Sequence, residues 1–398
     1  MRVTSTTANM QYYMQLSSQQ YAAAQEQVAT GLRVNNPSDD PTAASQYVVS
    51  QAESANNDQY TSNVSSVLGR LQTADSSLSS IVTTMNSVIT TGTEAANSTN
   101  NDSDFSGLAS RLSGYLSSII AQANTTYQGS YIFAGTESSV QPFMQAYSSY
   151  SSTNDPSSSP LTSATELTAG SVTIVGDAST GQSIEFRATD GSTVADLQSA
   201  IEDAVSAGTL SSGVTASINS SGQLEIDGSG GVAAYSNDTV LGSLSADTST
   251  IVDNAYAYMG NSGVNQTQVG ASMSVDNNVS GSSLFTTGTS ILSSLKSLIT
   301  AVDGGDVTDI GDAVTTVTSA LSSLSAVRVK LDNNISLLDD QETFLSNEQV
   351  TLASRQSSLV GVDMTDAVTN MTQAELANNA TLAAAGKTMS QTLLDYLK

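Results

Sequence analysis

The stretch ATGLRVNNPSDDPTAAS, Ala29–Ser45, lies between two long runs of residues that favour helix. Gly31 can adopt a left-handed backbone and end a helix, and the cluster Asn35–Pro37 cannot continue one. Asp40 then offers a carboxylate as an N-cap, and Pro41 has the fixed φ that suits a first helical position. The pattern therefore predicts a defined corner between two helices.

Apolar residues recur every three or four positions on both sides of this corner and far downstream. The longest stripe runs through Val64, Val67, Leu71, Ala74, Leu78, Ile81, Met85 and Val88. This a/d spacing over more than three heptads predicts a long helix, from Pro41 to about Thr91, packed against other helices. Shorter stripes follow at Phe105, Leu108, Leu112, Tyr115, Ile119 and Ala123, and at Ile291, Leu295, Leu298 and Val302.

The last long stripe contains Ile310, Val314, Val317, Leu321, Leu324, Leu331, Ile335, Leu338 and Leu345. Arg328 occupies the stripe position between Leu324 and Leu331. We expect either that its charged end reaches out of the seam or that Val327 takes its place through a small shift of register.

From about Val140 to Ala271 the heptads disappear and glycine becomes frequent. The segments SVTIVG, SIEFRA and VTASINSSGQLEID alternate with a period of two and predict short strands, the last forming a hairpin across Asn219–Gly222. STVADLQSAIEDAV predicts an amphipathic helix capped by Thr193. The segment SSYSSTNDPSSSP, which precedes these elements, is expected to be a flexible connector.

Together these patterns predict a mainly α protein with an inserted α+β domain. Helices from both chain ends would form a long antiparallel bundle, with a small β-rich central domain at its tip. We expect three parts: residues 1–45 with 356–398 as terminal helices, 46–144 with 256–355 as the long-helix bundle, and 145–255 as the inserted domain.

Composition argues against several classes of function. The 398 residues include no Cys, His or Trp, so disulfides, Cys-ligated metals and histidine general bases are excluded. With 37 acidic and 11 basic residues, the net charge of -26 would repel nucleic acid and anionic membranes. No window approaches the ~20 apolar residues of a membrane span, and the first residues lack the apolar stretch of a cleaved signal peptide.

Three motifs with catalytic or ligand-binding spacing favour structural interpretations. GDASTGQS has the spacing of a phosphate-binding loop but places Gln182 at the lysine position, so we expect a turn. NNDSDF begins like a calcium loop but has Phe105 at the glycine position and Arg111 at the final glutamate position. Asp39 and Asp40 could act as paired carboxylates, but an N-cap with Arg33 as an ion-pair partner is favoured. We therefore expect no catalytic, cofactor or metal site.

The two chain ends carry looser stripes, rich in Ala and Gln and poor in large apolar residues. Such a helix pair buries little surface compared with an ordering cost of ~1–2 kcal/mol per residue. We expect these ends to become ordered only against other subunits. The expected assembly residues are Met10, Met14, Tyr21, Val28, Leu32, Met371, Leu382, Met389, Leu393 and Leu397, and the expected corner residues are Gly31, Arg33, Pro37, Asp39, Asp40 and Pro41.

Three segments resemble the flagellin superfamily: ATGLRVNNPSDDPTAASQYVV, NTTYQGSYIFAGTESSVQPF and the ending AAAGKTMSQTLLDYLK. Pro37 and Pro41, which bracket Ser38–Asp40, and the segment YMGNSGVNQTQVGASMSVDNNVSGSSLF are similar to the hook–filament junction proteins of that superfamily. The resemblance covers residues 1–145 and 256–398. The central residues resemble only a short motif found in several flagellar proteins.

The resemblance implies a structural adaptor, not an enzyme, at the hook–filament junction of the bacterial flagellum. It implies a ring of identical subunits that contacts another hook-associated protein and flagellin. It further implies secretion through the flagellar type III export apparatus without a cleaved signal, and a cytosolic chaperone for the C-terminal helix. Two alternatives remain open: a flagellin filament subunit, and a secreted adhesin or enzyme that uses the central domain.

Overall fold

The computed structural model describes residues 2–155, 160–248, 251–285 and 290–396. These residues group into two compact units. The first contains Met1–Ser62 and Glu342–Lys398, and the second contains Asn63–Gln341. The expected division into three parts stays a prediction.

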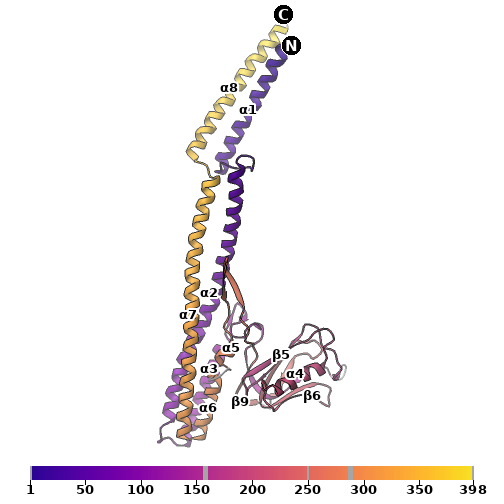
Figure 1. Cartoon of the computed structure of the whole chain (residues 1–398), viewed down its shortest axis with the longest axis vertical. Helices are drawn as coiled ribbons and strands as arrows, with labels where there is room; N and C mark the ends of the chain where they lie inside the picture. The colour runs from indigo at the N-terminus through magenta and orange to yellow at the C-terminus, as the bar shows by residue number, and fades with distance from the viewer. Residues whose placement is uncertain (1, 156–159, 249–250, 286–289, 397–398) are drawn as a thin grey trace. The chain divides into compact units, whose positions relative to one another are not determined.

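The helices come mainly from the two ends of the chain (Figure 1). Their bounds are α1 (Arg2–Thr30), α2 (Pro41–Ala95), α3 (Asp102–Ala123), α4 (Val194–Ser206), α5 (Gly281–Phe285), α6 (Ile291–Gly304), α7 (Val307–Val360) and α8 (Met364–Tyr396). The mainly α fold with an inserted α+β domain is thereby confirmed. Among the described residues, no helix combines the length and the apolar character needed to cross a membrane.

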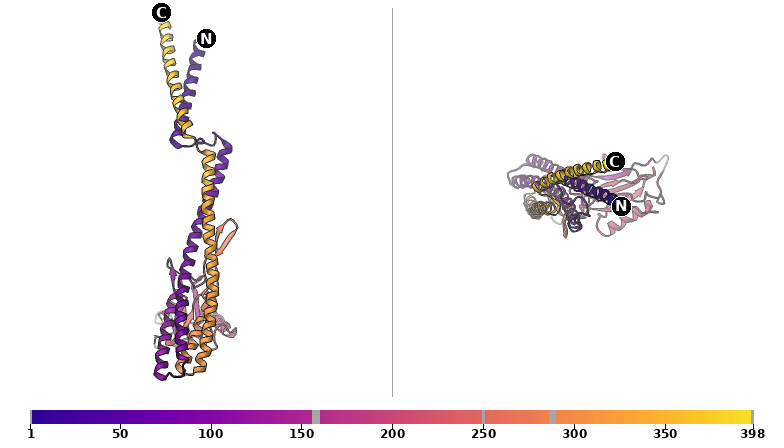
Figure 2. Two further views of the ribbon diagram at one scale, coloured as in Figure 1. Left: turned by 90° about the vertical axis from the view of Figure 1, so that its left-hand side faces the viewer. Right: turned by 90° about the horizontal axis from the view of Figure 1, so that it is seen from above.

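The first unit contains α1, α8 and the ends of α2 and α7 that adjoin them. Figure 2 shows α1 and α8 next to each other from a second direction. Polar side chains link α2 to α7 in this unit: Asn57 Nδ2 donates to the Leu345 carbonyl oxygen at 2.8 Å, and Gln356 Nε2 donates to that of Ser50 at 3.0 Å.

The second unit contains an antiparallel bundle of α2, α3, α6 and α7 (Figure 1). Short turns set this arrangement: Asn101 caps α3 through a capping box with Asp104, and Gly305 ends α6 with a φ of 70°. The predicted α2 stripe is confirmed, because all eight of its residues from Val64 to Val88 are buried. Large aliphatic side chains therefore fill the seam of this bundle.

The structure corrects one position of the predicted stripes and decides between the two alternatives for another. In α3, Leu116 is buried and Tyr115 only half-buried, because a straight helix of 3.6 residues per turn drifts from a strict heptad. In α7, Arg328 remains at the seam and forms an ion pair with Asp75 at 2.8 Å, each side chain keeping 26% exposure. A partner on α2 therefore accommodates the charge.

The central domain is built on a seven-stranded antiparallel sheet of order β5-β4-β7-β3-β8, with β6 on β7 and β9 on β3. Two further hairpins, β1–β2 and β10–β11, lie outside this sheet. The strand bounds are β1 (Thr126–Tyr127), β2 (Ser130–Tyr131), β3 (Phe143–Ser152), β4 (Val172–Asp177), β5 (Gln182–Arg187), β6 (Val214–Ile218), β7 (Leu224–Ser236), β8 (Leu244–Ala246), β9 (Ile251–Tyr258), β10 (Gln266–Gly270) and β11 (Met273–Asp276).

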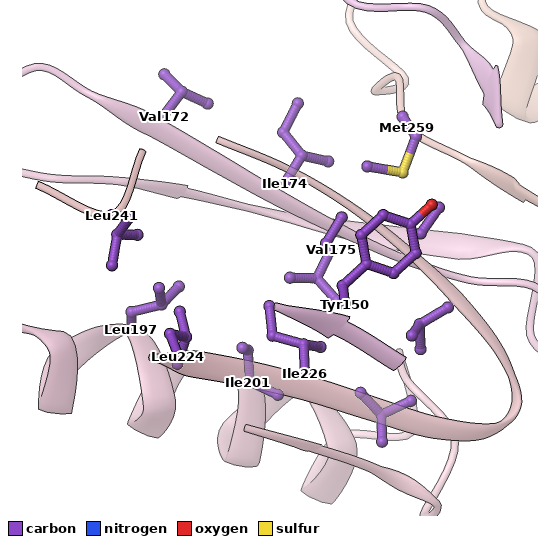
Figure 3. Packing of buried hydrophobic residues seen from close by; sticks show 14 of the residues in the cluster. Tyr150, Val172, Ile174, Val175, Leu197, Ile201, Leu224, Ile226, Leu241 and Met259 are labelled. Atoms are coloured by element: carbon purple, nitrogen blue, oxygen red, sulfur yellow. The ribbon is translucent and has the colours of Figure 1, made fainter. Parts of the chain in front are cut away.

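Helix α4 packs its apolar face against this sheet. Figure 3 shows Leu197 and Ile201 of α4 close to Leu224 and Ile226 of β7, and all four side chains are fully buried. Asp196 accepts a hydrogen bond from the Thr193 backbone N–H at 2.7 Å, which anchors the start of α4. The predicted helix in this domain is confirmed.

The other predictions for the central domain are mixed. The hairpin across Asn219–Gly222 is confirmed, since β6 pairs with β7 and Gly222 has a φ of 77°. GDASTGQS is a turn between β4 and β5, as expected. The expected connector SSYSSTNDPSSSP is wrong in its first part, because residues 148–152 belong to β3 and Tyr150 is buried in the core. The serine-rich composition suggested a connector, although its first part is a strand in which Tyr150 packs into the core. Residues 156–159 lie outside the described residues.

Candidate assembly surface

Among the side chains that the structure describes, the terminal helices α1 and α8 bury small ones. These are Ser17, Ala24, Ala367 and Ala385. Ser17 Oγ of α1 donates to Asn378 Oδ1 of α8 at 3.4 Å. The pair therefore holds little apolar surface away from solvent.

The structure places most of the predicted assembly residues on these two helices, and Leu32 in the corner that follows α1. Met10, Met14, Tyr21, Val28, Leu32 and Met371 are half-buried, and Leu382 is 49% exposed. Met389 and Leu393 belong to α8, but their side chains lie outside what the structure describes, and Leu397 lies outside the described residues.

Several other large apolar side chains on the same helices are exposed, unlike the half-buried residues of the predicted set. On α1 they are Tyr12 (61%), Tyr13 (60%) and Leu16 (38%), and on α8 they are Met364 (47%), Val368 (45%) and Leu376 (72%). Sequence analysis missed Tyr12, Tyr13, Leu16 and Leu376, because it followed one stripe per helix. Apolar residues outside that stripe were the available signal, since a second apolar face needs a second partner.

The corner at Gly31 is held by backbone hydrogen bonds to the chain's return segment. Gly31 has a φ of 72°, a left-handed conformation that ends α1. The Arg33 N–H donates to the Val360 carbonyl oxygen at 2.7 Å, and the Val362 N–H donates to the Gly31 carbonyl oxygen at 3.1 Å. These bonds tie the α1–α2 turn to the α7–α8 turn.

Side chains of the predicted corner residues complete this joint. Arg33 Nη2 donates to the Leu359 carbonyl oxygen at 2.9 Å and lies 3.3 Å from Asp40 Oδ2. Asp40 Oδ1 accepts the Ala43 N–H at 3.0 Å, directly before Pro41 begins α2. The Ala43 hydrogen bond, with further help from the Arg33 guanidinium, lowers the pKa of Asp40. Asp40 therefore acts as a charged N-cap.

Asp39 and Pro37 lie in the loop between Gly31 and Asp40. Asp39 Oδ2 accepts the backbone N–H groups of Asn35 at 3.1 Å and Asn36 at 2.9 Å. Pro37 is exposed. The carboxylate of Asp39 therefore fixes the loop through these two backbone donors.

A second capped turn on the return side was not predicted. Asp363 Oδ1 accepts the Thr365 N–H at 2.8 Å at the start of α8, and Leu32 forms a β-bridge with Gly361. Val34, Ala43 and Val360 form a small buried cluster between the two turns. The segment VGVDMT carried the signal, because an aspartate directly before a run of helix-favouring residues is a typical N-cap.

The described side chains of this region are mainly suited to packing. No group of three or more acidic side chains in the described ranges is arranged to hold a metal ion. The terminal pair carries exposed large apolar side chains, and the hydrogen-bonded α1–α2 and α7–α8 turns hold the two helices. Exposed apolar patches of this kind are typical of protein–protein interfaces.

Comparison with known proteins agrees with this description. Residues 4–138 match the bacterial flagellin N-terminal helical region, and residues 307–397 match the bacterial flagellin C-terminal helical region. The chain is similar to flagellar hook-associated protein 3 of Salmonella typhimurium, with 39% identity over 126 residues, and to that of Escherichia coli, with 38% identity over the same length. Each alignment covers 31% of this chain and 40% of the relative.

A solved structure from Vibrio parahaemolyticus, described as a flagellar hook-associated protein, shares the fold. It has a TM-score of 0.50 and 14% identity, and the match covers 81% of this chain and 100% of that one. The resemblance inferred from the terminal segments is thus confirmed. Because the two flagellin regions together match more than half of the chain, one at each end, the chain belongs to the flagellin family.

Proposed function

We propose that the chain is a structural adaptor that joins the flagellar hook to the filament and assembles as a ring through its terminal helices. The observation that carries this proposal is the exposure of large apolar side chains on α1 and α8, such as Tyr12 (61%) and Leu376 (72%). Similarity to hook-associated protein 3 supports a place at the flagellum and a structural, non-enzymatic role.

Assembly is coupled to the folding of the terminal pair. Burial of a Val or Leu side chain stabilises by about 1.5–3 kcal/mol, whereas ordering costs ~1–2 kcal/mol per residue. The pair buries Ser17 and three alanines among its described side chains, too little to offset the ordering of two long helices. Neighbouring copies, another hook-associated protein and flagellin supply the missing burial. A cytosolic chaperone covers the C-terminal helix before type III export.

Gene deletion tests the role in the cell. Without the adaptor, hooks remain and filament protein escapes into the medium, and immuno-electron microscopy of the tagged chain labels the hook–filament junction. Label along the whole filament, with no escaped filament protein after deletion, would instead indicate a filament subunit. That second candidate is favoured by one observation, the match of both chain ends to flagellin regions.

A substitution pair tests the surface. Leu376→Gln should abolish incorporation at the junction while the secreted chain keeps its helical content. Ile251→Gln, at a side chain 53% exposed on β9 of the central domain, should incorporate normally. If only Ile251→Gln blocks function, the central domain carries the activity and the adaptor proposal fails.

Limited proteolysis tests the folding step. In the dilute monomer both ends should be cut rapidly, leaving a fragment of about 45–355 with ends uncertain by several residues. Ends as resistant as the bundle would contradict coupled folding.

A further inference from the structure

A polar hollow of about 330 Å³ lies in the second unit, lined by α2 and by the hairpins β1–β2 and β10–β11. Its walls include Ser66 and Arg70 of α2, Tyr127 and Ser130 of the first hairpin, Thr267 of β10, and Asn277 directly after β11. Ligand pockets range from ~300 to 1,000 Å³. This hollow therefore suits one side chain or one small molecule.

Arg70 brings a positive charge into the hollow without a partner for it. Among the described residues, Arg33, Arg111, Arg187, Arg328 and Arg355 each form an ion pair with a carboxylate, and Arg70 forms none. Its Nη2 donates to the Tyr131 carbonyl oxygen at 3.3 Å, but its Nε is buried and has no acceptor in the described chain. Burial lowers the pKa of Arg70, with no opposing carboxylate to raise it.

Asn277 contributes a second unsatisfied group. Its Nδ2 donates to Thr267 Oγ1 at 2.9 Å, while its Oδ1 is buried and has no donor in the described chain. Because a threonine hydroxyl can donate or accept, a 180° turn of the amide keeps the Thr267 bond and replaces the unsatisfied acceptor with an N–H donor. Asn277 can therefore assist an anion beside Arg70.

The local backbone holds these walls in place. Tyr127 lies against α2 at Gly69, where a Cβ would be 2.5 Å from Tyr127 Oη. Gln128 and Gly129 both have positive φ values, 50° and 80°, as a two-residue hairpin turn of type I′ requires. The glycine before Arg70 thus allows the hairpin to close over the helix and shape one side of the hollow.

We propose that this hollow is a carboxylate-binding site in which Arg70 and Asn277 donate hydrogen bonds to the oxygens of one carboxylate. The planar guanidinium matches a carboxylate in shape and charge. A dianion such as phosphate would meet a single cation in a chain of net charge -26. The carboxylate belongs either to an Asp or Glu side chain of a second copy or to a small free acid, and the experiment separates these sources.

The test follows the Nε–H signals of the full chain labelled with [¹⁵N]arginine. Sodium acetate should shift the Arg70 signal saturably, with a midpoint on the order of 10 mM, whereas sodium chloride at equal ionic strength and the neutral isostere acetamide should not. The signal should be missing in Arg70→Gln, and Arg187→Gln should respond like the unsubstituted chain. Asn277→Leu should raise the midpoint about tenfold.

An unsaturable response to acetate, or an equal response to acetamide, would overturn the proposal. The titration of the unsubstituted chain decides this even where a variant fails to fold, and Arg70→Lys then assigns the signal. Concentrating the chain in chloride identifies the source. A shift like that of acetate that grows with chain concentration assigns the carboxylate to a second copy, whereas a signal independent of chain concentration assigns it to a free acid. Because the isolated chain is used, the result does not depend on the flagellar role.

Discussion

Two helical regions of the molecule differ in the size of the side chains that they bury. One is the bundle of the second unit, and the other is the terminal pair of the first unit. In the bundle, Leu78, Ile81 and Met85 of α2 are completely buried. In the terminal pair the buried residues with described side chains are a serine and three alanines, while Leu376 and Leu382 remain 72% and 49% exposed. Both regions are long helices with apolar periodicity.

The difference shows that periodicity predicts a helix but does not say where its partner is. The stabilisation from a seam depends on the apolar area that each contact removes from water. A seam of leucines buries its large apolar side chains within one chain. A seam of alanines beside exposed leucines leaves the large side chains in solvent, so their burial requires a second chain. The size of the side chains at the seam therefore separates a core from an assembly surface.

The strongest test of this contrast compares leucine truncations in the two regions. Leu78→Ala should lower the free energy of unfolding by about 2–5 kcal/mol, because it opens a cavity in a filled seam. Leu382→Ala should change it by less than ~0.5 kcal/mol. Urea unfolding of the monomer, followed by circular dichroism, measures both. An equal loss in Leu382→Ala would mean that the terminal pair is a core in its own right.

A smaller effect is expected from charge at the bundle seam. Asp75→Ala leaves Arg328 half-buried without its partner, and we expect a loss of about 1–2 kcal/mol, below the 3–5 kcal/mol of a fully buried pair. Arg355→Ala, which removes an exposed pair with Glu53 at 3.6 Å, should cost less than ~1 kcal/mol.

A double substitution completes this comparison. In Asp75→Leu/Arg328→Leu both charges are gone, so unfolding in urea should return close to that of the unsubstituted chain. If the double variant is less stable than either single variant, the attraction within the pair exceeds the desolvation cost of burying its two charges. The pair then has a net stabilising effect on the seam.

Most of the helical fold could be predicted from sequence, because its signals are local. The α2 stripe, the turn before α3 and the corner around Asp40 each depend on residues a few positions apart. The strand at residues 148–152 could not be predicted, because its assignment depends on pairing with β7 and β8, which lie far along the chain. The serines in this segment are compatible with a connector and with a strand.

Of the two turns that form the corner, only the α1–α2 turn could be predicted from the sequence. The Gly31 corner was read from its own residues, but its hydrogen bonds end at Leu359 and Val360, more than 300 positions away. The capped turn at Asp363 carried an N-cap signal and was overlooked. Arg70 and Asn277, whose unsatisfied groups carry the carboxylate proposal, line one hollow only in the folded chain. No spacing in the sequence indicates that they share it.

The corner itself can be tested at Gly31. Gly31→Ala places a Cβ on a left-handed backbone and should destabilise the corner by about 1–2 kcal/mol, although nothing lies within 4 Å of the new atom. Gly107→Ala, within α3 and equally uncrowded, should stabilise its helix by about 0.5–1 kcal/mol. Hydrogen exchange of the Arg33 amide and of α3 amides, measured on the assembled chain in which the ends are ordered, reports the two sites. A destabilised α3 would contradict the assignment of these effects to backbone conformation.

The smallest expected effect is the pH response of the Asp40 cap, which the bundle seam should lack. Hydrogen bonding from Ala43, assisted by Arg33, lowers the pKa of Asp40 in the folded chain. A depressed pKa means that the carboxylate stabilises the fold above its ordinary titration range and that this contribution is lost as pH falls through the lower, folded value. In the assembled chain, in which the ends are ordered, protection of the Arg33 amide, corrected for intrinsic exchange, should therefore fall below about pH 4, while protection at Leu78 stays constant. Asp40→Asn keeps a good N-cap without a titrating group, so its corner should lose less protection over the same range. A corner that responds identically in both chains would assign the acid sensitivity to another carboxylate, with Asp363 at the matching turn the first to substitute.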